Sequence, residues 1–120
     1  MITGVINDKL EPLLDDIFID GKNGWIPLRT ILDTGFNSTF CLPRKYLEEA
    51  KMEFLTEIEA ELCDGRIILE EAYLGTVLVN NQPHVVEITL TDSETAVMGM
   101  EMLLEKEAIF NLKTMTVEVK

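Results

Sequence analysis

Histidine, cysteine and positive charge are all scarce in this chain of 120 residues. One histidine and two cysteines are too few for most metal-binding or disulfide frameworks, so we expect no metal and no cofactor. Ten basic residues face 22 acidic ones, which gives a net charge of −12 at pH 7. Phosphate backbones and anionic lipid headgroups repel such a charge, so we expect neither nucleic acid nor a membrane as a partner.

Long apolar runs are absent as well. The longest stretch without a charge, 72–86, is interrupted by the polar residues 80–84 and is too short for a membrane span. The first residues lack the basic and apolar segments of a signal peptide, so we expect a cytoplasmic protein. Cys41 and Cys63 lie 22 positions apart without a CxxC motif. Reduced thiols are the favoured interpretation, and a disulfide remains the alternative.

What the chain does contain is enough apolar material for one core. Hydrophobic residues make up 47% of the sequence, and the length suits one ordinary domain over residues 1–120. No tract rich in serine, glycine or proline indicates a linker, and no repeat is present.

Short apolar runs separated by turn residues predict an all-β domain. Asp64-Gly65, inside the turn 63–66, is the strongest hairpin signal, and Gly21 to Gly24 and Asn80 to Pro83 indicate further turns. The expected strands are 13–20, 25–32, 57–62, 67–74, 76–79, 85–90, 96–100, 109–112 and 115–119. Short helices are expected at 44–52 and 101–106. We interpret the whole as a closed or nearly closed barrel with one or two short helices.

The segment 31–39 carries the clearest chemical signal. Asp33 directly follows an apolar strand and precedes Thr34 and Gly35. A carboxylate at the end of a buried strand is costly to ionise without stabilising N–H groups or a partner carboxyl, so Asp33 is a candidate for an acid with a perturbed pKa. Gly35 permits a tight turn and the close approach of another backbone. Asp-Thr-Gly is also an ordinary turn sequence, so the motif alone decides little.

The surroundings of this motif resemble the retropepsin-like aspartic proteases, and more closely their small cellular relatives in bacteria and archaea. Residues 31–37 read Ile-Leu-Asp-Thr-Gly-Phe-Asn and lead to Leu-Pro at 42–43, while residues 97–104 read Val-Met-Gly-Met-Glu-Met-Leu-Leu. Two motifs in this order, in a chain of this length, make the resemblance specific. It covers residues 13–119 and implies a retropepsin-like acid protease barrel.

The resemblance also implies roles for individual residues. Asp33 would be the catalytic aspartate, Thr34 would join a hydroxyl grip between two active-site loops, and Gly35 would complete the loop. Residues 117–120, together with the N-terminus, would build a sheet between two chains. The flap that closes over the substrate would have its tip at Cys63, Asp64, Gly65 and Arg66. The strand that supports the active-site loop would contain Met98 and Gly99.

Aspartic-protease chemistry requires two copies of this chain. Two neighbouring carboxyls can share one proton, so that one activates water while the other polarises the scissile carbonyl. Among the seven aspartates only Asp33 lies in such a motif. A second Asp33 would have to come from a second copy across a two-fold axis. The predicted function is therefore a homodimeric aspartic endopeptidase acting on a peptide or protein.

Two other interpretations remain open. Phe36 stands where retroviral enzymes place alanine, and the flap tip has one glycine, so the chain could be an inactive barrel that binds a peptide or protein partner. It could also be an acidic monomer with an ordinary Asp-Thr-Gly turn. The segment 48–71 has nine acidic and two basic residues, which indicates a solvated face or, alternatively, a preference for cationic peptides.

Overall fold

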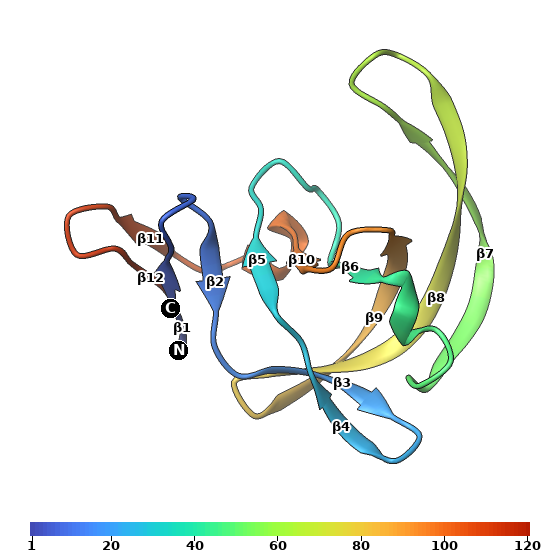
Figure 1. Cartoon of the computed structure of the whole chain (residues 1–120), viewed down its shortest axis with the longest axis horizontal. Coiled ribbons are helices and arrows are strands. Elements are labelled where there is room, and N and C mark those ends of the chain that lie inside the picture. Colours follow the sequence, from blue (N-terminus) through green and yellow to red (C-terminus); the bar gives the residue numbers. More distant parts are fainter.

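Strands make up most of the molecule, as the sequence predicts (Figure 1). The structure is a computed structural model that describes residues 1–120. The strands of the first half are β1 (Ile2–Ile6), β2 (Pro12–Leu14), β3 (Ile17–Gly21), β4 (Gly24–Pro27), β5 (Thr30–Leu32) and β6 (Phe40–Pro43). Those of the second half are β7 (Met52–Glu61), β8 (Ile67–Val79), β9 (Gln82–Thr91), β10 (Ala96–Met98), β11 (Ala108–Asn111) and β12 (Thr116–Val119). Two 3₁₀ turns complete the fold, η1 (Arg44–Tyr46) and η2 (Met100–Leu103).

All twelve strands belong to one curved sheet. The order of hydrogen-bonded neighbours is β11-β12-β1-β2-β5-β10-β6-β9-β8-β3-β4, and β7 pairs with β8. The sheet is not closed, because no pairing joins β4 at one end to β11 at the other. The all-β class is confirmed, with the strands wrapped around a core rather than joined into a ring.

Two expected strands are each divided into two. The run 13–20 breaks at Asp15-Asp16, where Asp16 has φ 55°, and β2 and β3 consequently pair with different neighbours. The run 25–32 breaks after β4, and the amide of Leu28 there donates to the carbonyl of Ile17 at 2.9 Å. Both expected strands are divided because their halves contact different neighbours that are distant in the sequence. The local pattern of apolar residues does not encode these contacts.

The predicted hairpins form, with small changes at their turns. β7 and β8 pair in antiparallel register around the tip at residues 62–66. Asn80 and Asn81 both have positive φ, 49° and 65°, so they make a two-residue turn and Pro83 belongs to β9. The two expected helices shrink to η1 and η2, and after η1 the amide of Lys51 bonds to the carbonyl of Asp20 instead of continuing a helix.

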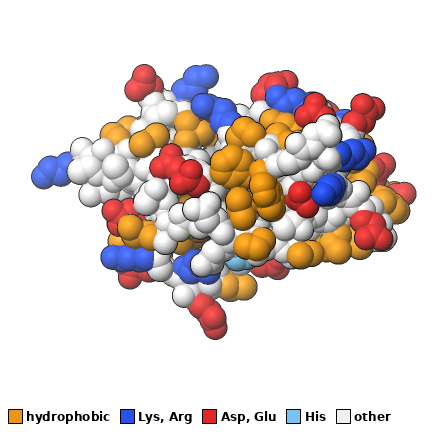
Figure 2. Space-filling view, turned by 90° about the horizontal axis from the view of Figure 1, so that it is seen from below, with side chains coloured by type: hydrophobic (Ala, Val, Ile, Leu, Met, Phe, Trp, Pro, Cys, Tyr) orange, Lys and Arg blue, Asp and Glu red, His pale blue; other side chains and the backbone are white.

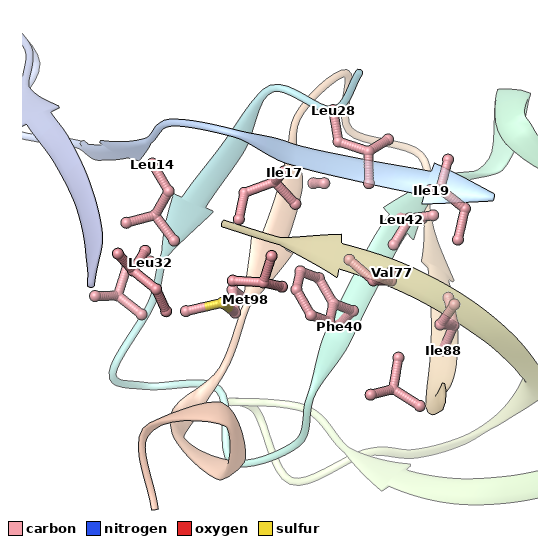
Figure 3. Close-up of a cluster of buried hydrophobic side chains, with 14 of the residues drawn as sticks. Leu14, Ile17, Ile19, Leu28, Leu32, Phe40, Leu42, Val77, Ile88 and Met98 are labelled. Carbon is pink, nitrogen blue, oxygen red and sulfur yellow. The ribbon is translucent and has the colours of Figure 1, made fainter. Parts of the chain in front are cut away.

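The core lies between the curved layers of the sheet (Figure 3). Phe40 and Met98 are fully buried at its centre, beside Ile19, Val77 and Ile88 from β3, β8 and β9. Burial of a side chain of this size stabilises the fold by about 1.5–3 kcal/mol. Leu32 ends β5 and Phe40 begins β6, and both are buried and paired with Met98, so the core fixes both ends of the segment that carries Asp33.

The terminal strands pair within the chain, which corrects one expectation. β12 has β1 on one side and β11 on the other, and Lys120 exchanges backbone hydrogen bonds of 3.0 and 2.7 Å with Glu107. Val117 and Val119 are buried. Residues 117–120 therefore have no free edge with which to build a sheet between two chains.

Charged groups cover the outside of the molecule. On the face in Figure 2, which is opposite to the loop between β5 and β6, acidic and basic side chains surround a central group of apolar ones. Three of the four ion pairs join exposed side chains, for example Arg44 to Asp92 at 3.1 Å and Lys45 to Glu94 at 3.0 Å, and the fourth joins Lys51 to half-buried Asp20. No helix has the length and apolar character needed to cross a bilayer.

Candidate active site

The candidate site is built on a crossing of three short strands. β10 lies between β5 and β6, parallel to β5 and antiparallel to β6. The segment 33–39, which joins β5 to β6, must therefore arch over the end of β10. The amide of Asp33 donates to the carbonyl of Met98 at 3.0 Å and ties the start of this arch to β10. Asp33 is thus fixed at the end of a buried strand, as the sequence predicts.

Gly99 supports the arch from below. A Cβ atom at this position would lie 2.2 Å from the carbonyl oxygen of Ser38 and 2.6 Å from that of Phe36. The amide of Gly99 donates to the carbonyl of Thr39 at 2.8 Å, and that of Met100 donates to the carbonyl of Phe36 at 2.8 Å. The absence of a side chain at Gly99 allows this close backbone contact. Met98 and Gly99, the predicted support residues, both contact the loop.

The functional groups of the loop point to solvent. Asp33 Oδ1 accepts a hydrogen bond from the amide of Gly35 at 2.8 Å, and both residues are exposed. The hydroxyl of Thr34 makes no hydrogen bond within the chain, whereas buried Thr39 donates to the carbonyl of Glu87 at 2.5 Å. A single chain therefore provides one exposed carboxylate and one free hydroxyl, and it does not supply the burial that we expected around Asp33.

The predicted flap is a long hairpin whose tip lies on the same side of the molecule as the loop 33–39 (Figure 1). Gly65 has φ 85°, and its amide donates to the carbonyl of Leu62 at 2.9 Å. Asp64 accepts bonds from the Arg66 amide at 3.0 Å and from Arg66 Nε at 2.7 Å, which orders the turn. Cys63 is exposed at the same tip.

Sequence reasoning missed some of the contacts that shape the site. The carbonyls of Phe36 and Ser38 accept bonds from η2, and backbone acceptors leave no signal in the sequence. At the base of the hairpin, Tyr73 donates its hydroxyl hydrogen to Glu71 and packs edge-on against Phe54 at 5.8 Å between ring centroids. The hydrogen bond to Glu71, aided by burial, raises the pKa of Tyr73 above its ordinary value.

The two cysteines are both free thiols. Cys41 is half-buried in β6, and burial raises the pKa of its thiol, although a hydrogen bond with Thr89 acts in the opposite direction. No group of three or more His, Cys, Asp or Glu side chains is arranged to hold a metal ion.

Two hollows of the surface lie away from Asp33. One of about 340 Å³ lies between Arg44, the outer part of β8 and the end of β9, and another of about 380 Å³ lies beside Lys51 and Met52. Asp33 lines neither of them. In one chain, the candidate catalytic group is on an open surface.

Comparisons with known proteins support the fold at low sequence similarity. No protein-family model and no curated protein matches the chain. Among solved structures, a retropepsin-like aspartic protease from Rickettsia conorii superposes with a TM-score of 0.59 and 13% identity, over 96% of this chain and 86% of that one. The protease of simian foamy virus (mac) superposes with a TM-score of 0.54 and 16% identity, over 78% of this chain and 99% of that one.

The chain therefore has the retropepsin-like fold, which confirms the architecture implied by the motifs around Asp33 and Gly99. One of these structures is viral and the other bacterial, so assignment to the small cellular branch stays a prediction.

Proposed function

We propose that the chain is a homodimeric aspartic endopeptidase in which Asp33 of each copy forms the catalytic pair. The observation that carries the proposal is the position of Asp33 in a retropepsin-like fold. Its amide is bonded to Met98 on the central strand β10, and its carboxylate is exposed on the surface of one chain. A catalytic carboxylate that needs a second copy has to be accessible in each separate chain.

The chemistry needs one proton shared between two carboxyls. Two carboxylates at short range cannot both ionise, so one stays protonated. The ionised carboxylate removes a proton from water, which attacks the scissile carbonyl, while the protonated one donates a hydrogen bond to the carbonyl oxygen. Collapse of the tetrahedral intermediate breaks the C–N bond, and the leaving amine takes up a proton from the pair.

The hairpin β7–β8 would cover an extended peptide above the two aspartates. Its tip turns at Gly65 and is held by the Asp64–Arg66 contacts, and its outer half is exposed. Because it pairs with the body only through the inner part of β8, this outer half is free to move over a substrate.

The rival function is that of an inactive barrel that binds a peptide or protein. It drew support from the bulk of Phe36, but the ring of Phe36 lies against Gly99, with Cδ2 2.6 Å from where a Cβ would be. The side chain is half-buried there and stabilises the loop. This packing gives the bulk of Phe36 a role in supporting the loop, so Phe36 by itself no longer favours the rival, whereas the single glycine of the flap tip still does.

The test is cleavage of a mixed peptide library between about pH 4 and pH 7 by the wild type and by Asp33→Asn. We expect the substitution to lower cleavage more than about a hundredfold, with an unchanged circular dichroism spectrum. Asp16→Asn is the matched control, since Asp16 is exposed, makes no side-chain hydrogen bond and has φ 55°, which asparagine tolerates. Equal cleavage by Asp33→Asn would refute the mechanism. A dimer that cleaves no library member would support the binding function.

A further inference from the structure

Four strands in the middle of the sheet, β5, β10, β6 and β9, have a core face and an opposite face. The core face carries a row of buried, paired residues, Leu32, Met98, Phe40 and Ile88. Side chains alternate between the two faces of a strand, so the next row points the opposite way. The register of the sheet places Ile31, Val97, Cys41 and Thr89 side by side in this second row. The first three of them are partly exposed.

Asp33 lies on the same face as this second row. It follows Ile31 by two residues, and its amide continues the ladder between β5 and β10 by donating to the carbonyl of Met98 at 3.0 Å. The row therefore forms a floor that starts beside Asp33 and crosses β10, β6 and β9. Neighbouring strands lie about 4.8 Å apart, so Thr89, three strands from Ile31, is about 14 Å along the floor.

A hollow of about 340 Å³ lies at the far end of this floor, between β9, the outer part of β8 and Arg44. Tyr73 of β8 pairs with Ile88 on the core face. Glu70 lies three residues before Tyr73 on the same strand, so it points with Thr89 to the opposite face. The hollow is therefore on the face of the sheet that carries the candidate catalytic loop.

The floor and the hollow meet near Cys41. Burial is the main cause of the raised pKa of the Cys41 thiol, and the hydrogen bond with Thr89 and the charges of Glu70 and Arg44 modify it. Charges perturb a thiol in this way only from nearby positions. A side chain of the floor is thus a close neighbour of two charged groups of the hollow.

The hollow is negatively charged, and one of its carboxylates has no partner. Its lining includes three acidic residues and one basic residue, Glu70, Glu71, Asp92 and Arg44. Asp92 is paired with Arg44 at 3.1 Å, and Glu71 accepts the hydroxyl hydrogen of Tyr73. Glu70 is half-buried and makes no hydrogen bond or ion pair within the chain. Such a carboxylate has lost part of its hydration without gaining a partner, so a cation from a ligand would bind there favourably.

We propose that this hollow binds a basic side chain of the peptide substrate and that Glu70 is the residue that selects it. The ammonium or guanidinium group reaches Glu70, while the aliphatic stem lies against Ile68, which is 37% exposed. An extended peptide advances about 3.3 Å per residue, so a hollow about 14–19 Å along the floor is about four to six residues from the scissile bond. The inference rests on the proposed function, since it names the substrate class of the same site.

The test uses a peptide that the wild type cleaves, with a lysine, glutamine or glutamate placed in turn at about two to seven positions on either side of the scissile bond, because a symmetric dimer has two hollows. We expect lysine to raise kcat/KM at least about tenfold over glutamine at about four to six positions, through a lower KM with kcat unchanged. Glu70→Gln should abolish this preference, and Glu70→Lys should reverse it in favour of glutamate.

Glu59→Gln is the matched control. It removes the same charge from the same hairpin, but Glu59 is exposed on β7 and does not line the hollow. This variant should keep the preference for lysine. Three results overturn the proposal: equal cleavage of lysine and glutamine peptides by the wild type, an unchanged preference in Glu70→Gln, or an equal loss of preference in both variants.

Binding to Asp33→Asn separates this inference from the proposed function, because it needs no cleavage. The probe is a labelled, neutral extended peptide with a lysine or a glutamine near each end, followed by fluorescence anisotropy. A preference for lysine that Glu70→Gln removes, in a protein whose wild type cleaves nothing, refutes the proposed function and leaves the hollow as a binding site for basic peptides. Cleavage by the wild type with equal affinity for both peptides refutes the inference and leaves the proposed function standing.

Discussion

Gly99 lies directly beneath Ser38, so close that a Cβ atom on Gly99 would be 2.2 Å from the Ser38 carbonyl oxygen. This contact joins the end of β10 to the loop that carries Asp33. Because the neighbouring atoms are backbone, they cannot move aside without distorting the loop.

Gly99→Ala should therefore destabilise the protein by about 1–3 kcal/mol or prevent folding. Thermal and denaturant unfolding measure this loss. Gly35→Ala is the control in the same loop, since the nearest atom to its Cβ is a side-chain oxygen of Asp33 at 3.2 Å. A Gly99→Ala variant with the wild-type melting temperature would show that the loop is not held as described.

Two threonines at opposite ends of the loop should behave differently when each is replaced by valine. Thr39 is buried and bonded to Glu87 within the chain, so Thr39→Val should lower the free energy of unfolding by about 1–3 kcal/mol. Thr34 has no partner within the chain, so Thr34→Val should leave the stability of a monomer unchanged and weaken the proposed dimer about tenfold.

Unfolding at low protein concentration and sedimentation at high concentration separate these two effects. Thr34→Ser keeps the hydroxyl and should restore the dimer. If Thr34→Val destabilised the isolated monomer as much as Thr39→Val, the hydroxyl of Thr34 would have a structural role inside one chain.

Much of this fold is readable from the sequence because its signals are local. Asp64-Gly65 and Asn80-Asn81 both lie at the turns of the hairpins that they predict. The position of Asp33 between an apolar strand and Gly35 likewise identifies the loop 33–39 from the sequence. The sequence predicts a supporting role for Gly99 only through the motif at residues 97–104, and not through the contacts that Gly99 makes. The steric reason for a glycine there depends on Ser38, 61 positions earlier, which only the folded chain brings near.

The errors arise where distant pairing overrides a local pattern. Asp16 adopts a positive φ, and the run 13–20 divides because its two halves pair with different strands. Residues 44–52 have the pattern of a helix, yet Ala50 bridges to Gly21 and Lys51 bonds to Asp20, so one 3₁₀ turn remains. The pairing of β12 on both sides is likewise invisible in the sequence, and it leaves residues 117–120 without a free edge.

The two thiols should differ in reactivity. Cys63 is exposed at the hairpin tip, whereas Cys41 is half-buried and burial raises its pKa, which lowers its thiolate fraction at neutral pH. A disulfide reagent such as Ellman's at about pH 7.5 should give a fast phase and a slow one. Cys63→Ser should remove the fast phase and Cys41→Ala the slow one. Equal rates at both positions would contradict the burial of Cys41.

Tyr73 should make the stability of the fold depend on alkaline pH. Its pKa is raised in the folded state by the hydrogen bond to Glu71 and then by burial, from an ordinary value of 10.0. The folded protein thus holds this proton more tightly than the unfolded chain. The stabilisation is fully present below about pH 10 and is lost as the pH rises through the higher folded pKa.

Tyr73→Phe should remove that alkaline loss, at a cost of about 1 kcal/mol near pH 8 for the missing hydrogen bond. Urea unfolding at about pH 8 and pH 11 measures both effects. Tyr46→Phe is the control, because the Tyr46 hydroxyl makes no hydrogen bond within the chain and the variant should retain the alkaline loss. If Tyr73→Phe kept the same decline, another group would be responsible, and the Tyr73–Glu71 contact would not stabilise the base of the hairpin.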